Sequence, residues 1–180
     1  YALMPYSPTG GIVLKWFKDK FCTEEQLLAK KKDSHVFKIM DEMAMKIPPG
    51  SEGLIMLPFL TGALFPEFNP DARALFFNFS INHTKAHFIR AVLEAIGHMM
   101  QKYLESAEKL GIDIKKVISI GGGASSKLWC QIKADMTGLK IEVPKYTEMA
   151  LLGSAIIASV SLGMFKNLKV GEVLSETQFY

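Results

Sequence analysis

The sequence lacks the features that mark several classes of protein. Only two cysteines, Cys22 and Cys130, occur among 180 residues, which excludes a disulfide framework, and there is no Cys-x-x-Cys pair for zinc. The net charge of +3 is too small to predict binding to nucleic acid or to an anionic membrane surface. With 49% apolar and 22% charged residues, the composition excludes a disordered chain. We therefore expect a globular domain in a reduced, cytoplasmic setting.

Long hydrophobic runs are also missing. The longest stretch without a charge, residues 149–165, is shorter than the roughly 20 residues that span a bilayer, and it contains glycines and serines. It predicts a buried helix rather than a membrane segment. The first residues, 1–5, lack the basic region and apolar core of a signal peptide. Because the chain opens without a leading methionine, we expect it to be a fragment of a longer protein.

Hydrophobic periodicity predicts helices and strands that alternate in the last third of the chain. Helices are expected over residues 12–17, 35–46, 84–110, 126–137 and 148–162, and strands over 53–60, 116–120 and 140–143. Thr84 and Thr147 are expected to cap helices, and Thr23 with Gln26 fits a capping box. Strand–helix–strand–helix at this spacing predicts an α/β fold with a sheet covered by helices.

A glycine loop, Gly121–Gly123, lies between a predicted strand and a predicted helix. Glycine lets a ligand approach the backbone, and a helix start presents free N–H groups, so the loop suits a phosphate or a nucleotide. A tight turn without a ligand is the alternative. The dinucleotide pattern G-x-G-x-x-G is half met, because Ser126 stands at its last position. Glu142 follows near the spacing of a ribose-binding acid, which keeps a dinucleotide-binding oxidoreductase module open as a second hypothesis.

The histidines do not form a metal-binding pattern. His83 and His87 are four residues apart, but Thr84 follows the first, so the zinc-protease pattern H-E-x-x-H is absent. Their position at the start of a predicted helix favours a polar role at that helix start. No Ser/His/Asp or Cys/His arrangement for nucleophilic catalysis can be placed.

Several motifs, taken together and in order, resemble the C-terminal domain of the FGGY carbohydrate kinases, with the xylulose kinases as the nearest group. The resemblance is strongest where that family reads GGGA-x-S-x-x-W-x-Q-I-x-A-D. The segments that carry it are 57–62, 69–73, 87–94, 121–135, 143–144 and 149–155. Two positions depart from the family pattern: Asn78 replaces a usual glycine, and Ala63-Leu64 follow Gly62 where Glu-Arg is common.

The resemblance implies an actin-like (ribonuclease H-like) ATPase fold with two domains and ATP between them. Residues 1–180 would form the nucleotide-side C-terminal domain, and the N-terminal sugar-binding domain and the first strands would be absent. The catalytic Asp would lie in that absent domain, so no catalytic or metal-ligating residue is assigned here. This chain alone is therefore expected to be inactive.

The implied reaction transfers the γ-phosphate of ATP, with Mg²⁺, to a sugar hydroxyl. D-Xylulose, giving D-xylulose 5-phosphate, is the expected substrate, with gluconate, ribulose or glycerol as alternatives. The implied partners are the sugar, ATP, the protein's own N-terminal domain and a second copy in a homodimer. A domain that keeps the fold without binding nucleotide remains a third hypothesis.

Carried over position by position, the resemblance implies a nucleotide site. Gly122 and Gly123 would lie against the adenosine and phosphates, and Ser126 and Lys127 would hydrogen-bond near the nucleobase or ribose. Gly11 and Lys15 match the helix that closes the other side of the adenine pocket. A solvated lysine beside Trp16 is the alternative for Lys15.

Overall fold

The computed structural model describes residues 9–145, 148–171 and 177–179. Its α-helices are α1 (Gly11–Phe21), α2 (Thr23–Lys31), α3 (Val36–Ala44), α4 (Lys85–Lys109), α5 (Lys127–Thr137) and α6 (Met149–Ser161). Two short 3-10 helices are η1 (Ser51–Gly53) and η2 (Gly122–Ser125), and the strands are β1 (Ile55–Leu57), β2 (Leu75–Phe77), β3 (Lys116–Ile118), β4 (Lys140–Pro144) and β5 (Thr177–Phe179). The order β3–α5–β4 confirms the predicted strand–helix–strand unit.

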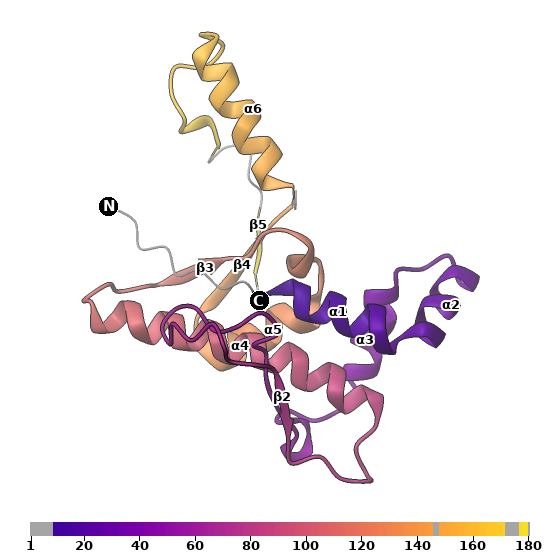
Figure 1. Ribbon diagram of the computed structural model, residues 1–180. Coiled ribbons are helices and arrows are strands. Elements are labelled where there is room, and N and C mark those ends of the chain that lie inside the picture. Colours follow the sequence, from indigo (N-terminus) through magenta and orange to yellow (C-terminus); the bar gives the residue numbers. More distant parts are fainter. Residues whose placement is uncertain (1–8, 146–147, 172–176, 180) are drawn as a thin grey trace.

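Two small sheets are present in the described residues (Figure 1). In the first, β1 and β2 pair antiparallel, with Ile55 opposite Phe77. In the second, β3 and β4 run parallel, as a helical crossover requires, and β5 pairs antiparallel with β4. The predicted strand over 53–60 is shorter than expected, because Gly53 has a positive φ and Pro58 cannot donate to a ladder.

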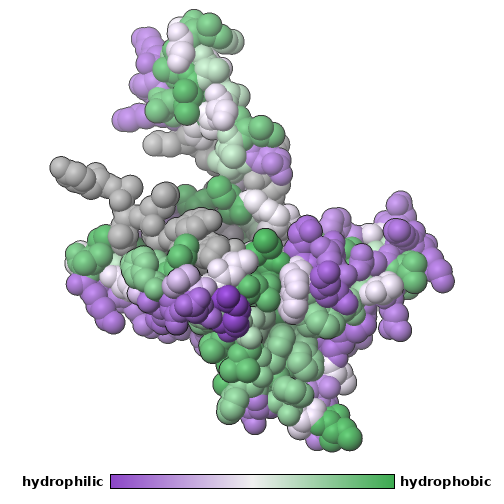
Figure 2. Space-filling model, in the orientation of Figure 1, coloured by the Kyte–Doolittle hydropathy of each residue, from purple (hydrophilic) through white to green (hydrophobic). Residues whose placement is uncertain are grey.

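The long helix α4 is the support on which the other elements pack (Figure 1). Helices α1, α3 and α5 and strand β1 all contact it. Their apolar faces form one core, whose buried members include Val13, Leu14, Phe17, Met40, Leu54, Ile89, Val92, Leu93, Trp129 and Ile132. The outer face of β1 and β2 stays apolar and exposed, and apolar side chains gather over it in Figure 2.

The expectation that α6 is buried is wrong. This helix projects from the body (Figure 1), and Leu151 is 69% exposed, although Ile156 is buried. Apolar composition predicts burial only if a surface lies opposite the helix, and α6 leaves the end of β4 pointing away from the core. Of the helices described, none is long and apolar enough to cross a membrane.

The start of α4 confirms the roles expected for the histidines. The backbone N–H of Thr84 donates to Nδ1 of His87 at 3.0 Å, and that of Ser80 donates to Nδ1 of His83 at 2.8 Å. Both rings therefore serve the helix start. The capping box expected at Thr23 is wrong: Cys22 precedes α2, and the Gln26 amide reaches back to the carbonyl of Lys18 instead.

One face of α4 holds the turn that leads into β1. Ser51 and Glu52 both adopt positive φ, at 50° and 53°, which costs backbone energy in residues other than glycine. The buried Glu94 carboxylate compensates, because it accepts from the Gly50 N–H at 3.0 Å and from the Ser51 hydroxyl at 2.8 Å. Arg90 donates to the same carboxylate at 2.7 Å.

The structure explains why asparagine can stand at position 78, where the family pattern has glycine. Its φ is +63°, a left-handed conformation that glycine adopts freely and that asparagine tolerates better than most residues. Its side chain also donates to the Gly53 carbonyl at 3.0 Å. The replacement of glycine therefore keeps the backbone conformation of this turn.

Trp129 joins α5 to α4 and to the glycine loop. Its indole N–H donates to the Leu93 carbonyl at 3.1 Å, and a Cβ added to Gly123 would lie 3.0 Å from its ring. The amine of Lys133 lies 4.7 Å from the ring centroid and 3.4 Å from the Ser119 hydroxyl. Lys133 is only 9% exposed, and burial lowers its pKa.

Replacing Glu94 by alanine should destabilise the domain strongly. The change leaves Arg90 buried without its carboxylate and frees the turn at Gly50 and Ser51, so we expect a loss of about 3–5 kcal/mol in the free energy of unfolding. Urea unfolding measures it. Glu105→Ala, an exposed position on the same helix, is the control and should change stability by less than about 0.5 kcal/mol. Equal losses in the two variants would contradict the role given to Glu94.

Replacing Lys133 by methionine tests the buried amine. Because the folded-state pKa lies below the usual 10.5, the unfolded chain holds this proton more tightly, and wild-type stability should rise as the pH climbs towards 10.5. Lys133→Met carries no buried amine whose charge burial disfavours. Its advantage in unfolding free energy over the wild type should therefore be largest near neutral pH and shrink towards pH 10. Urea unfolding across this range measures it. Gln131→Met, on the exposed side of α5, should show a pH-independent difference.

Candidate functional site

The glycine loop has the strand–loop–helix geometry that its sequence predicts. Strand β3 ends at Ile118, Gly121 adopts a φ of +78°, and η2 leads into α5. Ser126 caps α5, with its hydroxyl oxygen accepting from the Trp129 N–H at 3.0 Å. The loop thus delivers the chain to a capped helix start, where unpaired N–H groups and the helix dipole favour an anion.

The two glycines predicted to bind a nucleotide have different surroundings. Gly122 is exposed, and a Cβ added there would meet no atom within 4 Å, so its outer side is open to a ligand. Gly123 is half-buried against Trp129, and an added Cβ would lie 3.0 Å from the ring, so a side chain there would have to displace the ring slightly. The open backbone at Gly122 is therefore the part of the loop that a ligand can reach from outside.

An acid that sequence reasoning missed lies near Ser126. This is Asp41, which is half-buried on α3. Burial raises the pKa of the Asp41 carboxyl, and the nearby Ser126 hydroxyl opposes that rise. Nothing in the sequence pattern marks Asp41, because only the packing of α3 beside the start of α5 brings the two residues together.

The remaining predicted site residues lie on helix surfaces. Lys127 is exposed at the first position of α5, and Gly11 is exposed at the first position of α1, where a Cβ would meet nothing within 4 Å. The Lys15 side chain is 66% exposed and pairs with Asp19 at 2.9 Å. Lys18 also pairs with Asp19. The hydrogen bond from Lys18, and after it the one from Lys15, holds the pKa of the Asp19 carboxyl below its usual value.

The predicted site residues of the loop lie close together in the sequence. The predicted site residues on α1 are connected to them only through α4, on which both α1 and α5 pack. Gly122, Gly123, Ser126 and Lys127 surround one turn, whereas Gly11 and Lys15 lie on α1. Both α1 and α5 pack on α4, so this helix sets the spacing between the two groups. The ion pair of Lys15 keeps its amine along α1 rather than at the loop.

Glu142 does not take the position that a dinucleotide site needs. It lies within β4, is largely buried, and pairs with Lys116 on the neighbouring strand β3 at 3.0 Å. A ribose-binding acid would face solvent at the end of its strand. This geometry disfavours the oxidoreductase hypothesis.

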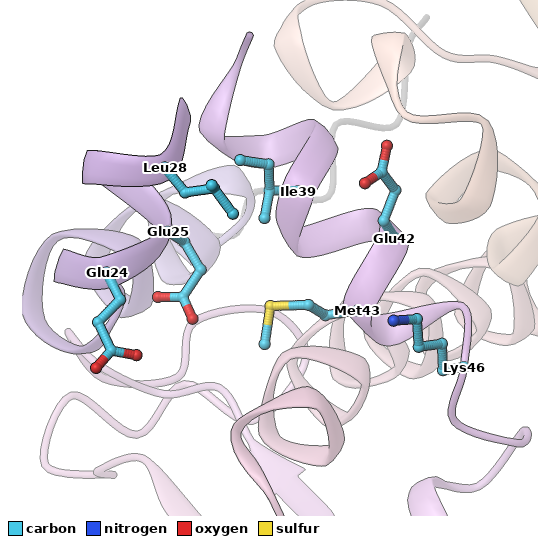
Figure 3. A pocket seen from close by; sticks show the side chains of 7 residues that line it. All are labelled: Glu24, Glu25, Leu28, Ile39, Glu42, Met43 and Lys46. Atoms are coloured by element: carbon cyan, nitrogen blue, oxygen red, sulfur yellow. The ribbon is translucent and has the colours of Figure 1, made fainter. Parts of the chain in front are cut away.

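A cavity of about 310 Å³ lies between α2 and α3 (Figure 3), and no residue of the glycine loop lines it. Its lining is Glu24, Glu25, Leu28, Ile39, Glu42, Met43 and Lys46. Three carboxylates against one lysine repel phosphate, and Glu25 is already paired with Lys85 at 2.9 Å. The cavity therefore does not suit a nucleotide. Across the residues the structure describes, no group of three His, Cys, Asp or Glu side chains could hold a metal ion.

Comparisons with known proteins agree with the resemblance seen in the sequence. The model of the "FGGY family of carbohydrate kinases, C-terminal domain" matches residues 2–162. A gluconokinase of Bacillus subtilis is 33% identical over 155 residues, which are 86% of this chain and 30% of that protein. An autoinducer-2 kinase of Yersinia enterocolitica is 35% identical over 169 residues, which are 91% of this chain and 32% of that protein.

Solved structures show the same fold. A ligand-bound xylulose kinase from Lactobacillus acidophilus superposes with a TM-score of 0.76 at 24% identity, over 96% of this chain and 33% of that chain. A Plasmodium falciparum glycerol kinase with ADP gives a TM-score of 0.68 at 28% identity, over 86% of this chain and 31% of that one. The predicted α/β, actin-like fold of these sugar kinases is confirmed.

The chain spans about a third of the length of the relatives that it matches. The matched third is the part that carries the strand, the glycine loop and the capped helix described above. By its sequence and by its fold, the chain belongs to the FGGY family of carbohydrate kinases and corresponds to that family's C-terminal domain.

Proposed function

We propose that this chain is the nucleotide-side domain of an ATP-dependent carbohydrate kinase. The observation that carries the proposal is the open backbone at Gly122, directly before a capped helix start. A phosphate or an adenosine can approach there without meeting a side chain, and the N–H groups of the helix start favour its negative charge. The glycerol kinase of Plasmodium falciparum, which shares this fold, was solved with ADP.

Each predicted residue has a definite part in this site. The backbone of Gly122 and Gly123 contacts the adenosine and phosphates, and Ser126 and Lys127 face the nucleobase or ribose. Gly11 and Lys15 close the other side of the adenine. Lys15 would have to leave its exposed pair with Asp19, which costs little because such surface pairs are worth about 0–1 kcal/mol.

The chemistry is divided between this domain and the rest of the kinase. Mg²⁺ bound with the nucleotide would neutralise part of the negative charge of the phosphates. The residues of this chain hold and orient the nucleotide, and the base that deprotonates the sugar hydroxyl comes from the N-terminal domain. Closure of the two domains excludes water and limits ATP hydrolysis. We propose residues 1–180 as one half of that clamp.

D-Xylulose remains our predicted substrate, and gluconate is the second candidate. The sequence motifs favour xylulose kinases, whereas a relative at 33% identity is a gluconokinase. Both are open-chain polyhydroxy compounds with a terminal hydroxyl to phosphorylate. A panel of these two with ribulose and glycerol, assayed on the longer kinase that contains this domain, distinguishes them by kcat/KM.

Replacing Gly122 by valine should weaken nucleotide binding while leaving the fold intact. The new side chain meets no protein atom but fills the space in front of the loop. The chain is titrated with Mg–ADP, Mg–ATP and NAD and followed by amide-resolved NMR. In the wild type, ADP and ATP should shift the amide resonances of Gly122, Gly123 and Ser126. We expect a loss of affinity of at least about tenfold in Gly122→Val.

The matched control for this variant is Gly153→Val on α6, where an added Cβ also meets nothing. It should bind ADP like the wild type. If the wild type binds NAD more tightly than ADP, the kinase proposal is overturned. The same follows if Gly122→Val binds ADP as tightly as the wild type does.

The chain by itself should not phosphorylate sugar. Its proposed base lies outside these residues, so nucleotide binding should occur without turnover. Release of ADP in a coupled assay, with D-xylulose or gluconate present, measures this. Detectable sugar phosphate from the purified chain would show that it carries its own catalytic base.

A further inference from the structure

We propose that Lys133 is a positioning residue for the nucleotide: its buried charge, which has no counter-ion among the described residues, acts through Trp129 on the glycine loop and favours a phosphate there. The inference rests on the proposed function, because it concerns the phosphates held at the same loop. It assigns a part in binding to a position that the motif shared with the kinase family leaves open.

A series of contacts joins the Lys133 amine to the glycine loop. The amine lies 4.7 Å from the centroid of the Trp129 ring, within the range of a cation–π interaction. The same ring lies so close to Gly123 that an added Cβ there would be 3.0 Å from it. The amine also lies 3.4 Å from the hydroxyl of Ser119, two residues before the first glycine of the loop. Lys133 therefore contacts one residue that leads into the loop and one that packs against it.

The structure gives this amine no acidic partner in the part of the chain that it describes. Lys133 is only 9% exposed and forms no ion pair there. On the same helix, burial raises the pKa of the Cys130 thiol, so this group stays neutral. On the neighbouring strand β4, the carboxylate of Glu142 is already paired with Lys116.

A buried charge without a partner costs folding free energy, because little water is left to solvate it. An apolar side chain at position 133 would cover the Trp129 ring without this cost. A phosphate at the loop would supply the missing opposite charge, and the attraction across the buried ring is screened less than one between surface charges. The amine thus lowers the stability of the chain and increases its affinity for an anion, a compromise that is common at binding sites.

Replacing Lys133 by methionine separates this role from a structural one. In NMR titrations at neutral pH, Mg–ADP should bind Lys133→Met about five- to tenfold more weakly than the wild type, because one unit of charge near the phosphates is lost. Adenosine has the same base and ribose but no phosphate, so its affinity should change by less than about twofold. Lys133→Arg keeps the charge and can keep the contact with the ring, so it should bind Mg–ADP within about threefold of the wild type.

Lys109→Met is the matched control, because it removes the same charge from an exposed position at the end of α4. Its affinity for Mg–ADP should equal that of the wild type. Unfolding of Lys133→Met is not expected to obscure the result, since this variant should be more stable than the wild type near neutral pH.

Three results would overturn the inference. They are an unchanged affinity for Mg–ADP in Lys133→Met, an equal loss for Mg–ADP and adenosine in that variant, and a Lys133→Arg variant that binds Mg–ADP no better than Lys133→Met. In each case binding of Mg–ADP by the wild type still supports the proposed function. If the wild type binds neither Mg–ADP nor adenosine, both proposals fail.

Discussion

The site depends on how Trp129 is held. Its indole N–H reaches a backbone carbonyl of α4, its backbone N–H completes the cap at Ser126, and its ring lies against Gly123. One side chain therefore couples the long helix, the start of α5 and the glycine loop. The ring packs closely against the backbone at Gly123, where an added Cβ would lie 3.0 Å from it, while the outer side of the loop at Gly122 stays open.

A second constraint acts in the same first half of α4. His87, Arg90 and Glu94 lie on one face of this helix, and each makes a polar contact in the structure. Together they hold the turn through Ser51 and Glu52, whose positive φ values need such support. The motif that resembles a kinase signature in this part of the sequence thus has a structural role, since it orients the segment leading into β1.

Some of the site could be predicted because its signals are local. The strand, the three glycines and the hydroxyl before α5 are consecutive in the chain, and a helix cap needs only neighbouring residues. The failures arose where local pattern was insufficient. Thr23 has the residues of a capping box, but Cys22 takes the position before α2. The apolar α6 was expected to be buried, but in the described residues it extends away from the core.

The sequence by itself determined the order of β3, α5 and β4, the glycine loop, the helix starts at Thr84 and Ser126, and membership of a kinase family, because these depend on short-range spacing and on ordered motifs. Tertiary structure alone decided that Asp41 lies near Ser126, that Glu142 pairs with Lys116, and that Glu94 supports a turn far away in the chain. Those contacts depend on how α3, α4 and α5 pack together, and such packing is set by the shapes of whole helix faces rather than by any single stretch of sequence.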